Sequence, residues 1–143
     1  MIMCNCDCEE EMRICEPILL KMGHLFQIQD DFFDCFGDPD ITGKVGSDIS
    51  EGKCCWPIVT ALKLCDSKQL KVLENNYGIN CEESVKRVKQ IYEEINLRAI
   101  YEKTIEEIHN DITSHINSLS NKSKKLYQNL FHHILIKIYR RIK

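Results

Sequence analysis

Apolar residues recur every three or four positions through most of this 143-residue chain, and that spacing restricts its fold more than any other feature. Between residues 16 and 36 they are Leu19, Met22, Phe26 and Phe33, and later segments keep the same period. A stripe with this period is typical of an amphipathic helix, whereas a half-buried strand alternates every second residue. No alternating run or βαβ pattern interrupts the stripes. The sequence therefore predicts an all-α protein.

The first helix is expected to start near Glu16 and to end at Phe36, because Pro17 fits only the first turn of a helix. The segment 37–53 then holds four glycines, one proline and three aspartates, a composition that favours a loop. Loops longer than about 12–15 residues without regular structure are usually functional or disordered. This segment is therefore a candidate site before any motif in it is considered.

Five further helices are expected after this loop. One covers 54–65, and Ser67 is expected to cap the next, which ends before Gly78. Asn80 and Glu83 form a capping-box pattern at the start of another helix. The apolar stripes of the last two helices are Tyr101, Ile105, Ile108, Ile112 and Ile116, and then Leu126, Leu130, Ile134 and Ile138.

Three aspartates, Asp30, Asp31 and Asp34, lie close together near the end of the first predicted helix. Positions three and four apart share one edge of a helix, so their carboxylates repel one another unless a divalent cation such as Mg²⁺ relieves the repulsion. Such a cluster alone is more often a solvated acidic edge. Gln27 on the same side and Lys44 in the glycine-rich loop favour a diphosphate-binding site instead.

The run 26–56 resembles the second aspartate-rich region of farnesyl diphosphate synthases, the trans-prenyltransferases of isoprenoid synthesis. The matching motifs, in order, are FQIQDD, DxxD, FGDP, TGK, a Ser-Asp pair and KCCW. The resemblance continues more weakly through 74–78 and 85–94, and it returns in the basic end at 137–143. A central block this specific is not explained by chance.

The resemblance implies that the chain is the C-terminal part of an isoprenoid-synthase-type bundle of antiparallel helices. Residues 16–143 are then that part of a polyprenyl synthetase domain, with a diphosphate and magnesium loop at 30–53, and residues 1–15 are an atypical leader rich in cysteine and glutamate. The implied reaction is the Mg²⁺-dependent head-to-tail condensation of an allylic diphosphate, dimethylallyl or geranyl diphosphate, with isopentenyl diphosphate.

The resemblance also implies roles for single residues. Asp30 would be the main magnesium ligand, and Asp31 and Asp34 would bind metal-bound water or complete the coordination. Gln27 would face the developing carbocation, and Lys44 would clamp the allylic diphosphate. The residues that would organise the loop and the diphosphate, or close the chain's end over the site, are Asp48, Lys53, Arg141 and Lys143.

The family also has a first aspartate-rich motif, but these 143 residues hold no second DDxxD. The family's lysine-threonine pair is missing too, since Lys103-Thr104 lies in a regular helical pattern. We therefore expect a C-terminal fragment, a truncated gene model or a degenerate paralogue that is inactive alone. The alternative is a non-catalytic pseudoenzyme that regulates a full-length synthase, because family members are commonly homodimers and a mixed dimer is then accessible.

Two other classes of function explain the sequence less well. The cysteines of the Cys4–Cys8 run are too closely spaced for a usual zinc site. The segment 121–143 carries seven basic and no acidic residues, but few aromatics, so we favour a helix end facing a diphosphate cavity over nucleic-acid or membrane binding. The positive charge of 121–143 is complemented by the acidic excess of 1–51, which holds twelve acidic and three basic residues.

No run of about 18 apolar residues predicts a membrane span. The opening MIMCNCDCEEE has neither the basic nor the apolar region of a signal peptide. We therefore expect a cytoplasmic protein whose nine cysteines are reduced thiols.

Overall fold

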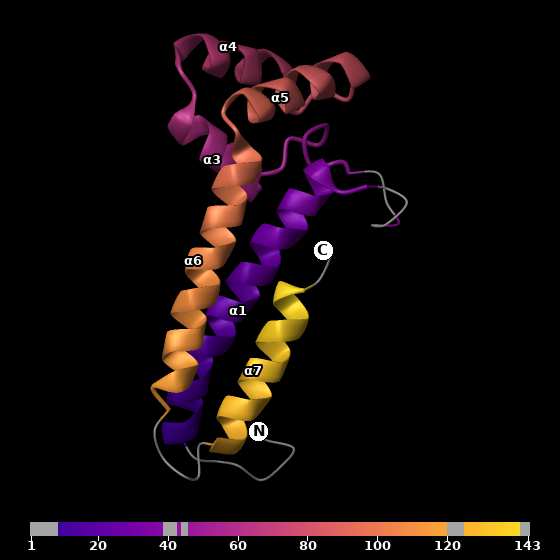
Figure 1. Cartoon of the computed structure of the whole chain (residues 1–143). Helices are drawn as coiled ribbons and strands as arrows, with labels where there is room; N and C mark the ends of the chain where they lie inside the picture. Colours follow the sequence, from indigo (N-terminus) through magenta and orange to yellow (C-terminus); the bar gives the residue numbers. More distant parts are fainter. Residues whose placement is uncertain (1–8, 39–42, 44–45, 120–124, 141–143) are drawn as a thin grey trace. The chain divides into compact units, whose positions relative to one another are not determined.

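The computed structural model describes residues 9–38, 43, 46–119 and 125–140, and within them every regular element is a helix (Figure 1). The helices are α1 (Glu9–Phe36), α3 (Trp56–Leu64), α4 (Ser67–Asn76), α5 (Glu82–Glu94), α6 (Leu97–Asn117) and α7 (Lys125–Tyr139). The described part of 37–53 contains turns and bends only. The all-α prediction is confirmed, and so is the loop within those described residues.

Helix α1 begins at Glu9 rather than at the predicted Glu16, and Pro17 lies inside it. A proline within a helix removes one backbone hydrogen bond and strains the preceding turn. Cys15 and Ile18, on either side of the proline, are 5% and 2% exposed. Burial of this face on both sides of Pro17 offsets the local cost, because most helix stability in proteins comes from packing of an apolar face.

The buried face of α1 differs from the predicted stripe. Met22 is buried as predicted, but Leu19 and Phe26 are 47% and 41% exposed. Two apolar stripes with the same period exist in this sequence, and periodicity alone does not choose between them. The buried apolar residues along α1 are Cys15, Ile18, Met22, Leu25, Ile28, Phe32 and Cys35.

The caps of α4 and α5 also differ from prediction. Asp66, and not Ser67, caps α4, because its carboxylate accepts hydrogen bonds from the backbone N–H of Lys68 and of Gln69. The Gln69 side chain accepts in return from the Asp66 N–H, which completes a capping box. The cap of α4 thus lies one residue before the expected Ser67. Helix α5 has Cys81 at its N-cap and no side-chain cap, so the predicted Asn80 capping box was wrong.

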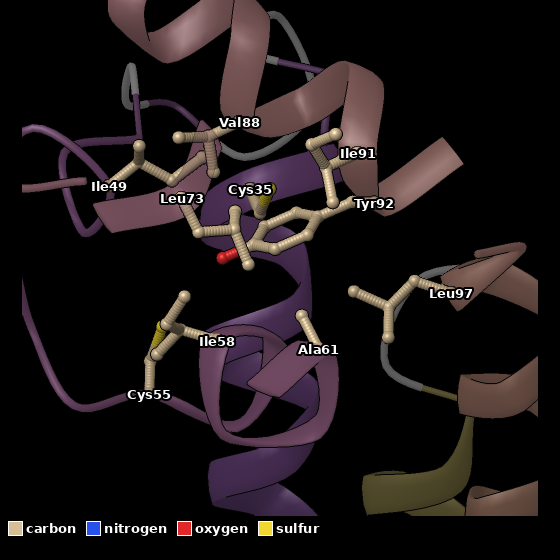
Figure 2. Packing of buried hydrophobic residues seen from close by; sticks show 10 residues of the cluster. All are labelled: Cys35, Ile49, Cys55, Ile58, Ala61, Leu73, Val88, Ile91, Tyr92 and Leu97. Carbon is tan, nitrogen blue, oxygen red and sulfur yellow. The ribbon is translucent and has the colours of Figure 1, made fainter. Parts of the chain in front are cut away.

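The chain divides into two compact units, residues 27–104 and the remainder. In the unit 27–104, helices α4 and α5 lie side by side (Figure 1). Its core joins the end of α1, the loop, α3, α4, α5 and the start of α6, with the Tyr92 ring packed inside it (Figure 2). The buried residues of this core are Cys35, Ile49, Cys55, Ile58, Ala61, Leu73, Val88, Ile91, Tyr92 and Leu97.

The other unit joins the first part of α1 to the later part of α6 and to α7. The Lys21 ammonium donates to the Asp111 carboxylate at 2.5 Å, which links α1 to α6. On α7, Phe131 and Leu135 are 4% and 1% exposed, whereas Leu130 is 51% exposed. The predicted stripe of the last helix was therefore displaced by one residue from the face that packs.

None of the helices in the described ranges combines the length and the apolar character that crossing a bilayer requires.

Burial raises the pKa of the Cys35 thiol to about 12, from an ordinary value of 9.0. The folded state therefore keeps this thiol's stability contribution below pH 9 and loses it as the pH rises towards 12. We expect the free energy of unfolding of the wild type to fall by about 1.4 kcal/mol per pH unit more than that of Cys35→Ala in this window. Urea unfolding at several alkaline pH values measures the difference.

The matched control is Cys54→Ala, since Cys54 is exposed. Its unfolding free energy should follow the wild-type slope with pH. Parallel pH profiles for the wild type and Cys35→Ala would contradict the expected ionisation of Cys35.

Candidate metal and diphosphate site

Asp31 joins the end of α1 to the start of α3. It is half-buried, and both of its carboxylate oxygens accept hydrogen bonds. Oδ1 accepts from the Gln27 side-chain amide at 2.7 Å, one turn earlier on α1. Oδ2 accepts from the backbone N–H of Trp56 at 2.8 Å. The loop between α1 and α3 is therefore tied at its far end to the aspartate motif.

Asp34 holds the middle of the same loop. It is 9% exposed, and its Oδ2 accepts the backbone N–H of Asp48 at 2.9 Å. Gly46 passes so close that a Cβ there would overlap the main-chain carbonyl oxygen of Asp34 and lie 2.9 Å from Oδ2. Only glycine allows this approach. The loop is thus anchored on α1 at two aspartates, through backbone amides rather than through long side chains.

Lys53 carries a cation in the described part of this loop. Its ammonium donates to Asp48 Oδ1 at 2.8 Å and lies 3.3 Å from Glu51 Oε2. The hydrogen bonds that its ammonium donates to Asp48 and then to Glu51 raise the pKa of Lys53, so it stays charged at neutral pH. Hydrogen bonds from Ser47 and then Lys53 lower the pKa of Glu51. Asp48 is 8% exposed, whereas the Lys53 side chain is half-exposed. The ammonium of Lys53 is therefore accessible to solvent while the buried Asp48 carboxylate holds it in place.

The turn between α4 and α5 contacts the backbone of the loop. The Tyr77 hydroxyl donates to the carbonyl oxygen of Lys53 at 2.6 Å, and the Gly78 N–H donates to the carbonyl of Ile49 at 2.9 Å. The segment 74–78 belongs to the weaker part of the resemblance, which implies no role for it in the site. The signal available there was a tyrosine-glycine pair that ends a helix.

The structure brings six of the predicted site residues into the unit 27–104, namely Gln27, Asp30, Asp31, Asp34, Asp48 and Lys53. Asp30 is half-buried on α1 beside Asp31. Lys44, Arg141 and Lys143 lie outside the described residues, as does the Cys4–Cys8 run.

The side chains at the end of α1 that could bind a metal present carboxylate oxygens, the ligand atoms that Mg²⁺ prefers. No group of three or more histidine, cysteine, aspartate or glutamate side chains converges into a metal cage in the described ranges. Asp31 already accepts two hydrogen bonds, and Asp34 is nearly covered. Such a set fits a magnesium ion held by one or two carboxylates and completed by water and phosphate oxygens.

Comparison with known proteins gives one consistent group of relatives. A family model described as "Polyprenyl synthetase" matches residues 1–95. The chain is 43% identical over 143 residues to the farnesyl pyrophosphate synthase of Rattus norvegicus, covering all of this chain and 40% of that protein. It is 41% identical over 134 residues to the farnesyl pyrophosphate synthase of Schizosaccharomyces pombe, covering 94% of this chain and 38% of that one.

A solved structure gives the same result. The structure of T. brucei farnesyl diphosphate synthase complexed with bisphosphonate superposes with a TM-score of 0.86 at 33% identity, over 92% of this chain and 36% of that one. The chain thus spans about two fifths of the length of the curated relatives it matches. The family match starts at residue 1, and the division of the chain at residue 15 stays a prediction.

Proposed function

Because the chain belongs to the polyprenyl synthetase family, we propose that it supplies the second aspartate-rich part of a farnesyl diphosphate synthase-like prenyltransferase site. The proposed reaction is the Mg²⁺-dependent head-to-tail condensation of an allylic diphosphate, dimethylallyl or geranyl diphosphate, with isopentenyl diphosphate. The observation that carries it is the DDxxD end of α1 bound to a loop that presents Lys53.

Asp30 would hold the magnesium, and Asp31 and Asp34 would orient its water or complete its coordination. Bound magnesium would neutralise the charge that builds on a departing diphosphate. Lys53, held by Asp48, adds a positive charge nearby. Lys44, outside the described residues, would clamp the allylic diphosphate, and the Gln27 amide would face the carbocation. Arg141 and Lys143 would close over the site.

The support for this mechanism is preorganisation. The Trp56 and Asp48 amides fix the two carboxylates that flank the site, and Asp48 fixes the ammonium of Lys53. Charged groups that are already in place do not have to be reoriented when a polyanion binds, which is how electrostatic catalysis is usually achieved. We further propose a cytoplasmic location and a homodimer or mixed dimer.

A chimera tests this function. The chain replaces the matching 40% of the rat farnesyl pyrophosphate synthase, and the product formed from an allylic diphosphate and isopentenyl diphosphate is measured with and without Mg²⁺. We expect Mg²⁺-dependent multiple turnover, because the chimera holds both aspartate-rich motifs. A folded chimera that binds both substrates without making product would contradict the proposal.

The 143-residue chain by itself is expected to give no multiple-turnover product in the same assay. One DDxxD motif would hold only part of the metal set, so the diphosphate leaving group would lack much of its charge stabilisation. Sustained product formation by the purified chain, with activity that follows the chain through chromatography, would overturn this expectation.

The alternative is a pseudoenzyme that binds a full-length synthase, and the observation that favours it is the single DDxxD in these 143 residues. It predicts that the chain co-purifies with a full-length synthase as a mixed dimer and changes its turnover. An active chimera would speak against this alternative, because the site residues of the chain would then be competent.

A further inference from the structure

The carbonyl oxygen of Lys53 is the point where the α4–α5 turn meets the diphosphate loop. It accepts the Tyr77 hydroxyl at 2.6 Å and also the backbone N–H of Cys55 at 2.9 Å. The Cys55 thiol lies 3.4 Å from the same Tyr77 oxygen. One phenol thus contacts both the main chain and a buried side chain of the segment 53–56.

The backbone of the same turn packs directly on the loop. The Gly78 N–H donates to the Ile49 carbonyl at 2.9 Å. A Cβ on Gly52 would lie 3.2 Å from the Cα of Gly78, and both glycines have positive φ, +67° and +77°. No side chain separates the two backbones. A movement of this turn is therefore passed on to the loop, because no flexible side chain lies between them to absorb it.

The segment 53–56 contacts residues of the candidate site at both of its ends. Its first residue, Lys53, presents the ammonium that Asp48 holds, and its last residue, Trp56, donates its backbone N–H to Asp31. Asp48 in turn donates its N–H to Asp34. The segment that Tyr77 contacts therefore carries one cation of the site, Lys53, and the amide that binds the Asp31 carboxylate.

We propose that Tyr77, supported by Gly78, is a positioning residue that sets the geometry of the diphosphate loop through its backbone. It thereby sets the affinity of the site for magnesium diphosphate. Its part in ligand binding rests on the function proposed above. Tyr77 acts through Lys53 and Trp56. The turn between α4 and α5 thereby becomes part of the site although it is remote from the aspartate motif in sequence.

The chain offers a matched control for removing the Tyr77 hydroxyl. Tyr92 lies in the same core and is fully buried, and its hydroxyl has no hydrogen-bond partner in the described structure (Figure 2). Tyr77→Phe deletes one oxygen from a half-buried ring, and Tyr92→Phe deletes one from a fully buried ring. Only the first deletes a bond to the loop.

The first measurement needs no ligand. Amide hydrogen exchange is compared at Trp56 and Asp48 in the full chain, in Tyr77→Phe and in Tyr92→Phe, with the amides of α5 as internal reference. We expect Tyr77→Phe to speed exchange at Trp56 and Asp48 about 10-fold relative to α5, because loss of the Lys53 contact lowers the free energy of local opening. Tyr92→Phe should leave both ratios unchanged.

The second measurement uses inorganic pyrophosphate with Mg²⁺, and the emission of Trp56, the single tryptophan of the chain, as readout. We expect Tyr77→Phe to weaken binding about 10-fold at a temperature where all three proteins are folded. Tyr92→Phe should bind like the wild type. A merely structural role would lower the melting temperature of Tyr77→Phe and leave the affinity of the folded protein intact.

The two measurements separate the failure of this inference from that of the proposed function. Unchanged exchange at Trp56 and Asp48 in Tyr77→Phe would overturn the positioning role, as would wild-type affinity in that variant. A wild-type chain that does not bind magnesium pyrophosphate would contradict the proposed ligand, and exchange would still decide whether Tyr77 fixes the loop.

Discussion

Asp30→Asn is expected to weaken Mg²⁺-dependent binding of inorganic pyrophosphate by the chain about 100-fold, which is about 2.7 kcal/mol. The substitution keeps the size of the side chain and its place on α1, and it removes the negative charge that we assign to the metal. Neighbouring Asp31 accepts hydrogen bonds with both oxygens, and Asp34 is 9% exposed, so neither is placed to replace Asp30 fully. Isothermal titration calorimetry at fixed Mg²⁺ measures the loss.

Glu74→Gln is the control for this experiment. It removes one negative charge from an exposed position on α4, within the same unit but outside the aspartate motif. Pyrophosphate affinity should stay within about twofold of the wild type, because solvent and salt screen the charge of an exposed side chain. Equal losses in the two variants would mean that net charge, and not a ligand position, governs binding.

Gly46→Ala is expected to cost about 3 kcal/mol in the free energy of unfolding and to reduce pyrophosphate binding as well. The added methyl group would overlap the Asp34 carbonyl oxygen, which belongs to the backbone of α1 and does not move aside. The loop would have to lift away, and the buried hydrogen bond from Asp48 N–H to Asp34 would break. Urea unfolding gives the stability change.

Gly23→Ala is the matched control, and it should change stability in the opposite direction. Gly23 lies inside α1 with nothing within 4 Å of the position of a Cβ. Alanine there should stabilise the chain by up to about 1 kcal/mol, because glycine is the poorer helix former. If the two alanine variants were equally stable, the close approach of the loop to Asp34 would be wrong.

Local patterns predicted the element types of this chain and the buried face of α6, where Tyr101, Ile105, Ile112 and Ile116 are buried, but they missed the buried faces of α1 and α7. Leu19 and Ile18 belong to stripes of the same period, and only packing selected the stripe with Ile18. Pro17 predicted a helix start, and burial on both sides of it overrode that local rule. The capping box at Asp66 was missed because the serine beside it is an equally good cap by residue type.

The candidate site was predictable where its residues lie close in sequence. Asp30, Asp31 and Asp34 share one helix edge, and the glycines of the following segment indicated a functional loop. The contact between Tyr77 and Lys53 was not predictable in this way, because it joins residues 24 positions apart through a backbone carbonyl. Backbone partners carry no signal in a sequence, so the amides of Trp56 and Asp48 were missed for the same reason.

The central claim is that the end of α1 and the loop that follows it form a magnesium diphosphate site. Calorimetric titration of the wild-type chain with inorganic pyrophosphate, in Mg²⁺ and again after chelation of Mg²⁺, tests it most directly. We predict saturable binding of one pyrophosphate that requires Mg²⁺ and is lost in Asp30→Asn. Binding that is equally strong without Mg²⁺, or that Asp30→Asn leaves unchanged, would contradict the claim.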